Sequence, residues 1–275
     1  MPARWWYVRG SWDFGYQQLA AAVKNADKHS PDWCIAQFYM GLMTVRSTVT
    51  ISLAHLTAVR DALAGHSPTR LLARSLAWRT GCLTSLGDIS PAAQEGRRAL
   101  TLARDLRDPI GEISALCWLI AAADYAGDQH VTKAWLRQAQ QIDQTGIPAW
   151  IALGFSLVVA EALGEVGQAA DARRFCTEAL GLAREAEALH DQGDCLRLMA
   201  RLDLLTGQQA EAKRHLKEAL EVSSQVSSRV LLISCLEACG DLCAVSRRWR
   251  EAITIWAASD VLNQAMCTGI GDLAL

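Results

Sequence analysis

Apolar residues recur every three or four positions along most of the chain, with polar residues between them. This spacing places the apolar side chains on one face of an α-helix, so each such stretch is expected to be an amphipathic helix. Prolines fall between the stretches, and strand patterns are almost absent. The pattern predicts thirteen helices, over about 11–28, 32–46, 50–64, 69–86, 90–106, 110–126, 130–145, 148–166, 169–187, 191–206, 209–224, 229–245 and 249–265.

The helices repeat with a period of forty residues. Turn glycines stand exactly forty positions apart, at Gly87, Gly127, Gly167 and Gly207. Twelve positions after each turn a small residue recurs, at Ala99, Ala139, Ala179, Ala219 and Ser259. After the leading helix at 11–28, the period predicts six helix pairs, over about 29–67, 68–108, 109–147, 148–188, 189–227 and 228–266.

The residue types at these positions have physical reasons. Glycine ends a helix readily because it adopts the left-handed backbone conformation that other residues resist. Small residues are expected where two antiparallel helices approach closely, since a larger side chain would overpack the crossing. One pair cannot bury its apolar face alone, so neighbouring pairs are expected to stack. The sequence therefore predicts an all-α fold, a right-handed superhelical solenoid of about six antiparallel pairs that forms one domain over 1–275.

Composition narrows the functional classes. The 275 residues are 51% hydrophobic and 20% charged, which suits a protein with a sizeable core. With 27 basic and 29 acidic residues, the net charge of −2 is too even for a dedicated binder of nucleic acids or membrane surfaces. The longest apolar stretches are about half as long as the ~20 residues of a membrane span, and the N-terminus does not resemble a secretory signal. We therefore expect a cytoplasmic protein without direct contacts to nucleic acid or membrane.

Residues for catalysis or metal binding are not arranged in known patterns. The nine cysteines include no C-x-x-C pair, and the six histidines never lie three or four positions apart. Cys235, Cys239 and Cys243 share one helix face, which suits either a redox or soft-metal site or a tight helix seam. Motifs of hydrolases, zinc proteases and dinucleotide-binding enzymes are absent from the sequence. The sequence predicts no enzyme activity, no metal and no cofactor.

The repeat resembles the tetratricopeptide repeat in its leucine eleven positions before the turn, its small residue seven before, its turn glycine and its alanines after it. A forty-residue version resembles the sensor arms of bacterial LuxR/MalT-like and SARP-like transcriptional regulators of the STAND class. The segments 5–19 and 249–262 carry this narrower resemblance. It implies neighbouring ATPase and DNA-binding modules. This chain contains neither a phosphate loop nor a recognisable helix-turn-helix.

The resemblance implies a concave groove lined by the first helix of each pair. Its register selects Asp124, Tyr125, Glu161, Asp194, Arg197, Arg201, Glu237 and Asp241, and also Glu165. Arg197 and Arg201 lie one helical turn apart, so they are expected either to clamp a carboxylate or phosphate of a ligand, or to pair with Glu161 and Glu237 in a structural network. The predicted partner in the groove is a protein, a peptide or a small-molecule effector.

Tryptophan placement adds a prediction about the ends. Trp78, Trp118, Trp150 and Trp256 are expected in helix seams, whereas Trp5, Trp6 and Trp12 are expected to cap the N-terminal end or to dock a preceding module. The sequence thus predicts a non-catalytic binding scaffold, the effector- or partner-binding arm of a bacterial transcriptional regulator. The alternative is a general peptide-binding adaptor unrelated to transcription.

Overall fold

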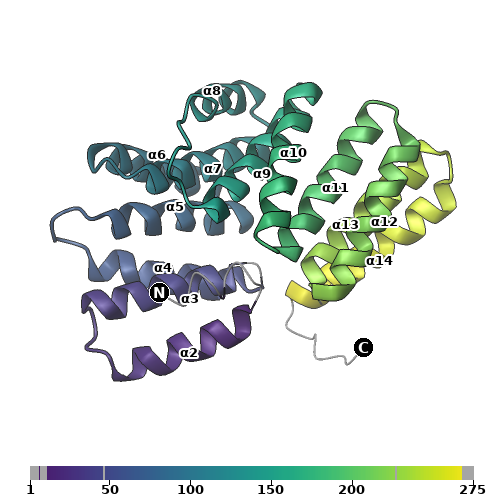
Figure 1. The fold of residues 1–275 in the computed structure, drawn as a ribbon. Coiled ribbons are helices and arrows are strands. Elements are labelled where there is room, and N and C mark those ends of the chain that lie inside the picture. Colours follow the sequence, from purple (N-terminus) through teal and green to yellow (C-terminus); the bar gives the residue numbers. More distant parts are fainter. Residues whose placement is uncertain (1–5, 7–10, 46, 227, 268–275) are drawn as a thin grey trace. The chain divides into compact units, whose positions relative to one another are not determined.

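The computed structural model of the chain describes residues 6, 11–45, 47–226 and 228–267, and the side chains up to residue 264. All thirteen predicted helices are present in this part, in antiparallel pairs (Figure 1). Their bounds are α2 Trp12–Asn25, α3 Pro31–Thr44, α4 Val49–Ala62, α5 Arg70–Ser85, α6 Ile89–Asp105, α7 Pro109–Tyr125, α8 Gln129–Ala139, α9 Ala149–Glu165, α10 Ala169–Glu185, α11 Leu189–Leu205, α12 Gln209–Val226, α13 Arg229–Val245 and α14 Trp249–Cys267. The predicted all-α, tetratricopeptide-like fold is confirmed.

The chain divides into two compact units, residues 1–167 and 168–275. The boundary at Gly167 falls on the turn between α9 and α10, so the predicted repeat 148–188 contributes one helix to each unit. In the first unit each helix from α2 to α7 packs on the next one, and α9 packs on both α7 and α8. In the second unit α10 to α14 pack in the same sequential way. A single continuous right-handed superhelix over 1–275 stays a prediction.

Left-handed residues end the helices, as the repeat predicts. Gly87, Gly127, Gly167 and Gly207 have φ values between 69° and 83°, and Arg247 takes the same conformation at the equivalent position with φ 59°. After the turn residues at 87, 127, 207 and 247, the next backbone N–H donates to the carbonyl five residues earlier, at 2.7 to 3.0 Å. This bond satisfies a carbonyl at the helix end that has no partner within the helix.

The predicted small residues lie in the helix seams. Ala99, Ala139, Ala179, Ala219 and Ser259 are all at most 1% exposed. Large side chains fill the space opposite other small residues. At Gly81 an added Cβ would lie 2.5 Å from the indole of Trp118, and at Gly240 it would lie 2.3 Å from the indole of Trp256. The seams therefore depend on small residues opposite large ones.

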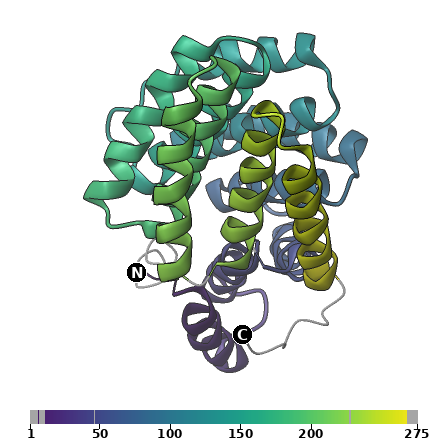
Figure 2. The ribbon, with the colours of Figure 1, turned by 90° about the vertical axis from the view of Figure 1, so that its right-hand side faces the viewer.

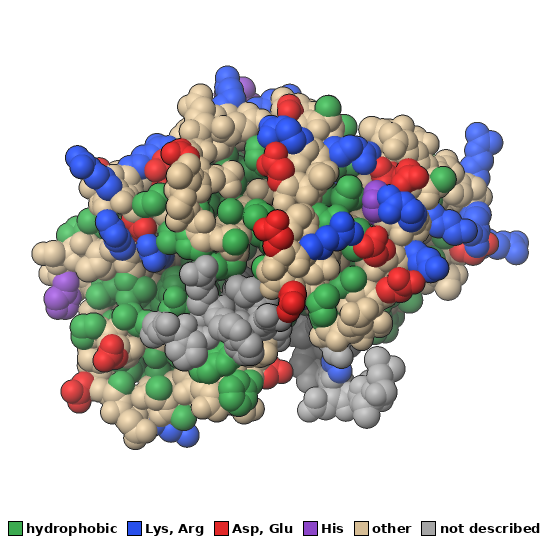
Figure 3. All heavy atoms as spheres, viewed as in Figure 1, with side chains coloured by type: hydrophobic (Ala, Val, Ile, Leu, Met, Phe, Trp, Pro, Cys, Tyr) green, Lys and Arg blue, Asp and Glu red, His purple; other side chains and the backbone are tan. Residues whose placement is uncertain are grey.

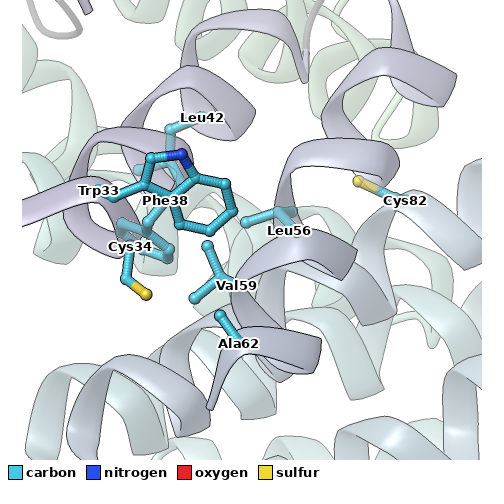
Figure 4. Close-up of a cluster of buried hydrophobic side chains, with 8 residues drawn as sticks. All are labelled: Trp33, Cys34, Phe38, Leu42, Leu56, Val59, Ala62 and Cys82. Atoms are coloured by element: carbon cyan, nitrogen blue, oxygen red, sulfur yellow. The ribbon is translucent and has the colours of Figure 1, made fainter. Parts of the chain in front are cut away.

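The tryptophans behave as predicted where the structure describes them. Trp78 and Trp118 meet edge to face, with ring centroids 5.3 Å apart, and Trp150 packs on a buried cluster of the first unit. Figure 4 shows this cluster, in which the indole of Trp33 points toward Leu56 and Val59 of α4. Its buried members are Trp33, Cys34, Phe38, Leu42, Leu56, Val59, Ala62 and Cys82.

The N-terminal helix is covered by aromatic side chains. Trp6 and Trp12 are half-buried and pack on a cluster that contains Leu19, Met40 and Met43. This packing supports the predicted capping role for both residues. Trp5 lies outside the described residues, and docking of another module stays a prediction.

Two predicted helix ends are wrong. The helix predicted over 130–145 ends at Ala139. The predicted last turn is replaced at 143–145 by a local turn, in which the side chain of Asp143 accepts a hydrogen bond from the backbone N–H of Thr145 at 2.9 Å. The helix predicted over 11–28 ends at Asn25. Ser30 then caps α3, where its Oγ accepts from the N–H of Trp33.

Candidate functional site

Within each unit, the first helices of successive pairs contact one another. Successive first helices pack on one another: α5 on α7 and α7 on α9 in the first unit, and α11 on α13 in the second. Within the part of the chain that the structure describes, successive second helices make no comparable contact. Such contacts are expected of the inner layer of a stacked helical-repeat scaffold. That the free face of this layer lines a binding groove stays a prediction.

The eight predicted groove residues divide between the two units. In the first unit Asp124 and Glu161 are half-buried, while Tyr125 at the end of α7 is 64% exposed. In the second unit Asp194, Arg197 and Arg201 are half-buried on α11, and Glu237 and Asp241 are exposed on α13. All eight lie on first helices, three in one unit and five in the other. Whether they form one binding surface stays a prediction.

Arg197 lies beside an acid of its own helix. Its Nε is 3.8 Å from Oδ1 of Asp194, and the guanidinium side chain is only 16% exposed. Asp194 also lies 3.4 Å from Nδ1 of His190, one turn earlier. The predicted structural partners of Arg197 and Arg201 were Glu161 and Glu237. The neighbour found here, Asp194, was not predicted as a partner, although the spacing of three residues on one helix permits the contact.

The charges of Arg197 and Asp194 also affect a cysteine of the neighbouring helix α13. Burial raises the pKa of the Cys235 thiol to about 12, while the charge of Arg197 lowers it and that of Asp194 raises it. Burial also raises the pKa of Cys239. A protonated thiol is a poor nucleophile and a poor metal ligand, so these cysteines fit the helix-seam interpretation better than the redox interpretation.

One group of potential metal ligands lies on α11. His190, Asp191 and Asp194 offer ligand atoms that all lie within 4.8 Å of one another. The guanidinium of Arg197 next to Asp194 already places a positive charge there, which disfavours binding of a second cation. The absence of a bound metal and of a cofactor stays a prediction.

A buried polar network in the second unit was not predicted. Asp203 of α11 is fully buried, and its Oδ1 accepts a hydrogen bond from Nη2 of Arg173 of α10 at 2.6 Å. Its Oδ2 accepts from Nδ1 of His215 of α12 at 2.7 Å, and Nη2 of Arg214 donates to Nε2 of that ring at 2.8 Å. The network joins three helices, so it fixes how they pack.

The repeat register contained the signal for this network. Forty residues before Asp203 stands Leu163, and forty before His215 stands Phe175, both of them buried. An acid and an imidazole at two positions that are apolar in the preceding repeat indicate a buried pair, because an unpaired charge there would be costly.

The first unit contains two comparable ion pairs. Arg74 of α5 donates to both carboxylate oxygens of Asp108, at 2.8 and 2.6 Å, and Asp108 is only 2% exposed. Arg79, which is 6% exposed, donates to Glu95 at 2.9 Å and also to the hydroxyl of Thr57. Such fixed arginines hold neighbouring helices in register and are not available to a ligand.

A pocket of about 580 Å³ opens in the first unit between the end of α4, the start of α5 and α6. Its lining combines apolar and charged side chains: Arg60, Leu63, Ala64, Gly65, His66, Pro68, Leu72, Arg98, Thr101, Leu102 and Asp105. Arg60 is engaged by Asp61 at 2.7 Å and by Glu95 at 3.6 Å. The repeat register does not indicate this pocket, because all of its lining residues except Leu72 lie on second helices or in the loop after α4.

The fold has close structural relatives. A Rap protein complexed with competence and sporulation factor superposes with a TM-score of 0.76 at 12% identity, over 97% of this chain and 74% of that one. The Rap conjugation gene regulator of the plasmid pLS20, in complex with the Phr* peptide, gives 0.74 at 13% identity, over 98% and 72%. Aspartyl phosphate phosphatase F from Bacillus subtilis gives 0.66 at 9% identity, over 91% and 64%.

The chain shares their tetratricopeptide-like fold. At these identities the likeness concerns the fold alone, and it does not extend to residues or activity. No family model and no curated protein sequence matches the chain. Because one structural relative is a phosphatase by name, the absence of enzyme activity stays a prediction.

Surface charge is mixed, as the composition predicts. Lys and Arg side chains alternate with Asp and Glu over the helices of the second unit in the view of Figure 3. Among the described residues, no helix combines the length and the apolar composition that a bilayer crossing requires.

Proposed function

We propose that the chain is a peptide- or protein-binding regulatory scaffold. The observation that carries this proposal is the structural likeness, over 97% and 98% of the chain, to two Rap structures solved with a bound factor or peptide. The first helices carry charged side chains. In a stacked helical scaffold, the layer of first helices is where an extended segment binds.

The recognition chemistry follows from the residue types. Arg197 and Arg201 bind a carboxylate of the ligand, because a guanidinium donates two parallel hydrogen bonds to such a group. Glu237 and Asp241, exposed on α13, bind basic groups of the same segment. In the first unit, Asp124, Tyr125 and Glu161 are proposed to make contacts of their own with a ligand, and the exposed ring of Tyr125 supplies apolar contact area there.

The narrower proposal is an effector-binding arm of a bacterial transcriptional regulator. It is supported by the resemblance of segments 5–19 and 249–262 to LuxR/MalT-like and SARP-like regulators, although residues 5 and 7–10 lie outside the described part. Peptide binding would then shift the packing between this arm and neighbouring ATPase and DNA-binding modules. The alternative is a general peptide-binding adaptor, and neither proposal requires catalysis.

Binding is tested with a random linear peptide library displayed on phage. Peptides enriched on the wild-type chain are synthesised, and their binding is measured by fluorescence anisotropy. We expect the double variant Arg197→Ala/Arg201→Ala to bind them at least tenfold more weakly, a loss of about 1.4 kcal/mol. The matched control is Arg184→Ala, which removes an exposed arginine of α10 that pairs with Glu218 at 3.0 Å. Its binding should be unchanged.

The stability of the same double variant separates the two roles of the arginines. If they clamp a ligand, the melting temperature changes little while binding is lost. A lower melting temperature with undiminished peptide binding would instead show that Arg197 and Arg201 are structural, and the clamp would be rejected. If no peptide is enriched on the wild-type chain, the peptide-binding proposal fails.

A further inference from the structure

The outward face of α14 carries apolar residues at positions that are polar in the equivalent helix. Ile253 and Val261 are 62% and 65% exposed, and forty residues earlier Lys213 and Glu221 occupy the same positions on α12. At the helix start, Trp249 is 59% exposed where α12 has Gln209. The repeat itself therefore does not require apolar side chains on this face.

The opposite side of α14 packs in the ordinary way. Ala252 and Ser259 are buried, and the indole N–H of Trp256 donates to the carbonyl of Glu237 on α13 at 3.4 Å. Figure 2 shows α14, in yellow, beside α13. Leu262, which is 37% exposed, corresponds to the half-buried Val222 of α12 and does not lie on the same face as Ile253 and Val261. The exposed stripe is a separate surface, at a different angle around the helix.

The stripe has the spacing of a helix–helix contact. Ile253, Ala257 and Val261 follow one another at intervals of four, so they form one ridge along the helix. All three are exposed, and the small Ala257 lies in the middle, where two helices approach most closely. Arg250 lies toward one end of this face and Asp260 toward the other.

These features make the stripe complementary to itself. When a second α14 packs antiparallel about Ala257, Ile253 of each copy meets Val261 of the other. The same arrangement brings Arg250 to the end where the second copy carries Asp260, whereas a parallel arrangement would bring like charges together. A two-fold contact requires exactly such a patch, because the same residues must serve both sides.

We infer that α14 is a self-association surface at which two copies of this chain pair antiparallel through Ile253, Ala257 and Val261. Two helices of this length packed along one ridge bury on the order of 1,000 Å² in total, the area at which specific interfaces begin. An interface at this lower limit of size suits a weak and reversible dimer. Self-association is independent of the peptide surface, which lies on the first helices.

The test compares single variants with their mixture in sedimentation velocity on the whole chain. Ile253→Lys and Val261→Glu copy the residues that α12 carries at the same positions, so both variants should fold with an unchanged melting temperature. Each alone is expected to weaken dimerisation at least tenfold. An equimolar mixture is expected to recover dimers, because one Lys–Glu pair and one intact Ile–Val pair form across the axis.

The matched control places the opposite charges on α12. Lys213→Glu and Glu221→Lys should leave the association of the chain unchanged. A wild-type chain that stays monomeric up to about 200 µM overturns the inference and leaves the stripe to a different protein. Single variants that dimerise like wild type, or a mixture that recovers nothing, overturn the antiparallel arrangement.

Discussion

The imidazole of His215 on α12 donates a hydrogen bond from Nδ1 to the buried carboxylate of Asp203 on α11, at 2.7 Å. Arg214 lies 2.8 Å from the other ring nitrogen, so both nitrogens of the ring have a hydrogen-bond partner. Arg173, whose side chain is 34% exposed, supplies the charge that compensates the carboxylate. The second unit thus contains a polar core element between helices that otherwise pack through alanines and leucines.

The first prediction concerns this pair. Asp203→Leu alone leaves the imidazole of His215 buried beside an apolar group and should lower the free energy of unfolding by about 3–5 kcal/mol. The double variant Asp203→Leu/His215→Phe copies Leu163 and Phe175 of the preceding repeat and should recover most of that loss, since apolar groups of similar volume replace the pair. Urea denaturation measures both.

A control variant removes an exposed ion pair in place of the buried one. Glu218→Ala removes the surface partner of Arg184 and should cost less than about 1 kcal/mol, because both side chains are solvated. If the double variant is as unstable as Asp203→Leu alone, the prediction is wrong. The Asp203–His215 pair would then contribute stability that the apolar residues of the preceding repeat cannot replace.

The fold could be predicted because the period of forty residues gives the positions of the helices, of the turn glycines and of the small residues in the helix seams. Gly127 ends a helix and Ala139 lies in a seam in the structure, and each follows from the position within the repeat. The prediction failed where a local side chain competed with the helix. The side chain of Asp143 accepts a hydrogen bond from the backbone N–H of Thr145 in a turn, and the period of forty residues contains no information about this bond.

For the candidate site, the sequence predicted which helix carries each residue and not which side chains lie next to one another. The register placed Arg197 and Asp241 correctly on first helices, and it did not reveal that Asp194 lies beside Arg197. The repeat marks concern glycines, alanines and leucines, so they contain no information about Asp203, although its equivalent Leu163 in the preceding repeat is apolar. A comparison of residue types at each repeat position, rather than of the repeat marks alone, would have found it.

The second prediction concerns a turn glycine. An added Cβ at Gly207 would meet no heavy atom within 4 Å, so any cost of substitution comes from its φ of 76°. Gly207→Ala should cost about 1 kcal/mol and Gly207→Val about 1–2 kcal/mol. Gly181→Ala, inside α10 with equally open space, should instead stabilise by about 0.5–1 kcal/mol. Equal effects at the two positions would contradict the conformational explanation.

The third prediction concerns the opposite change, in which glycine replaces a larger residue at a turn. Arg247 occupies the turn position of the last repeat with φ 59°, where its side chain makes the left-handed conformation unfavourable. Arg247→Gly should raise the free energy of unfolding by about 0.5–1 kcal/mol. Lys217→Gly, at an exposed position inside α12, should lower it by about 1 kcal/mol. Thermal unfolding of both variants decides whether the gain is specific to the turn.

The fourth prediction concerns alkaline pH. Burial raises the pKa of Cys117 from 9.0 to about 12, and that of Cys235 equally. Below pH 9 both thiols are neutral in the folded and the unfolded chain, so their contribution to stability is fully present. Between pH 9 and 12 only the unfolded chain ionises, and stability falls by up to about 1.4 kcal/mol per pH unit for each thiol.

Denaturation of Cys117→Ala at several pH values checks this sign. The variant is less stable than wild type at pH 8 because of the cavity, and its further loss between pH 9 and 11 should be smaller than that of wild type. Parallel curves for the two proteins would show that the Cys117 thiol ionises equally in both states.

The last prediction concerns the seam alanines. Ala179 and Ala219 are fully buried where two helices cross, so Ala179→Leu or Ala219→Leu forces the helices apart. Each should lower the free energy of unfolding by about 1–3 kcal/mol without touching the peptide surface. Glu178→Leu adds a leucine at the exposed neighbouring position on α10 and should change stability by less than about 0.5 kcal/mol. Were the alanine variants as stable as this control, the close approach of the helices at those two alanines would not limit packing, and the physical reason for the small residue in each repeat would have to lie elsewhere.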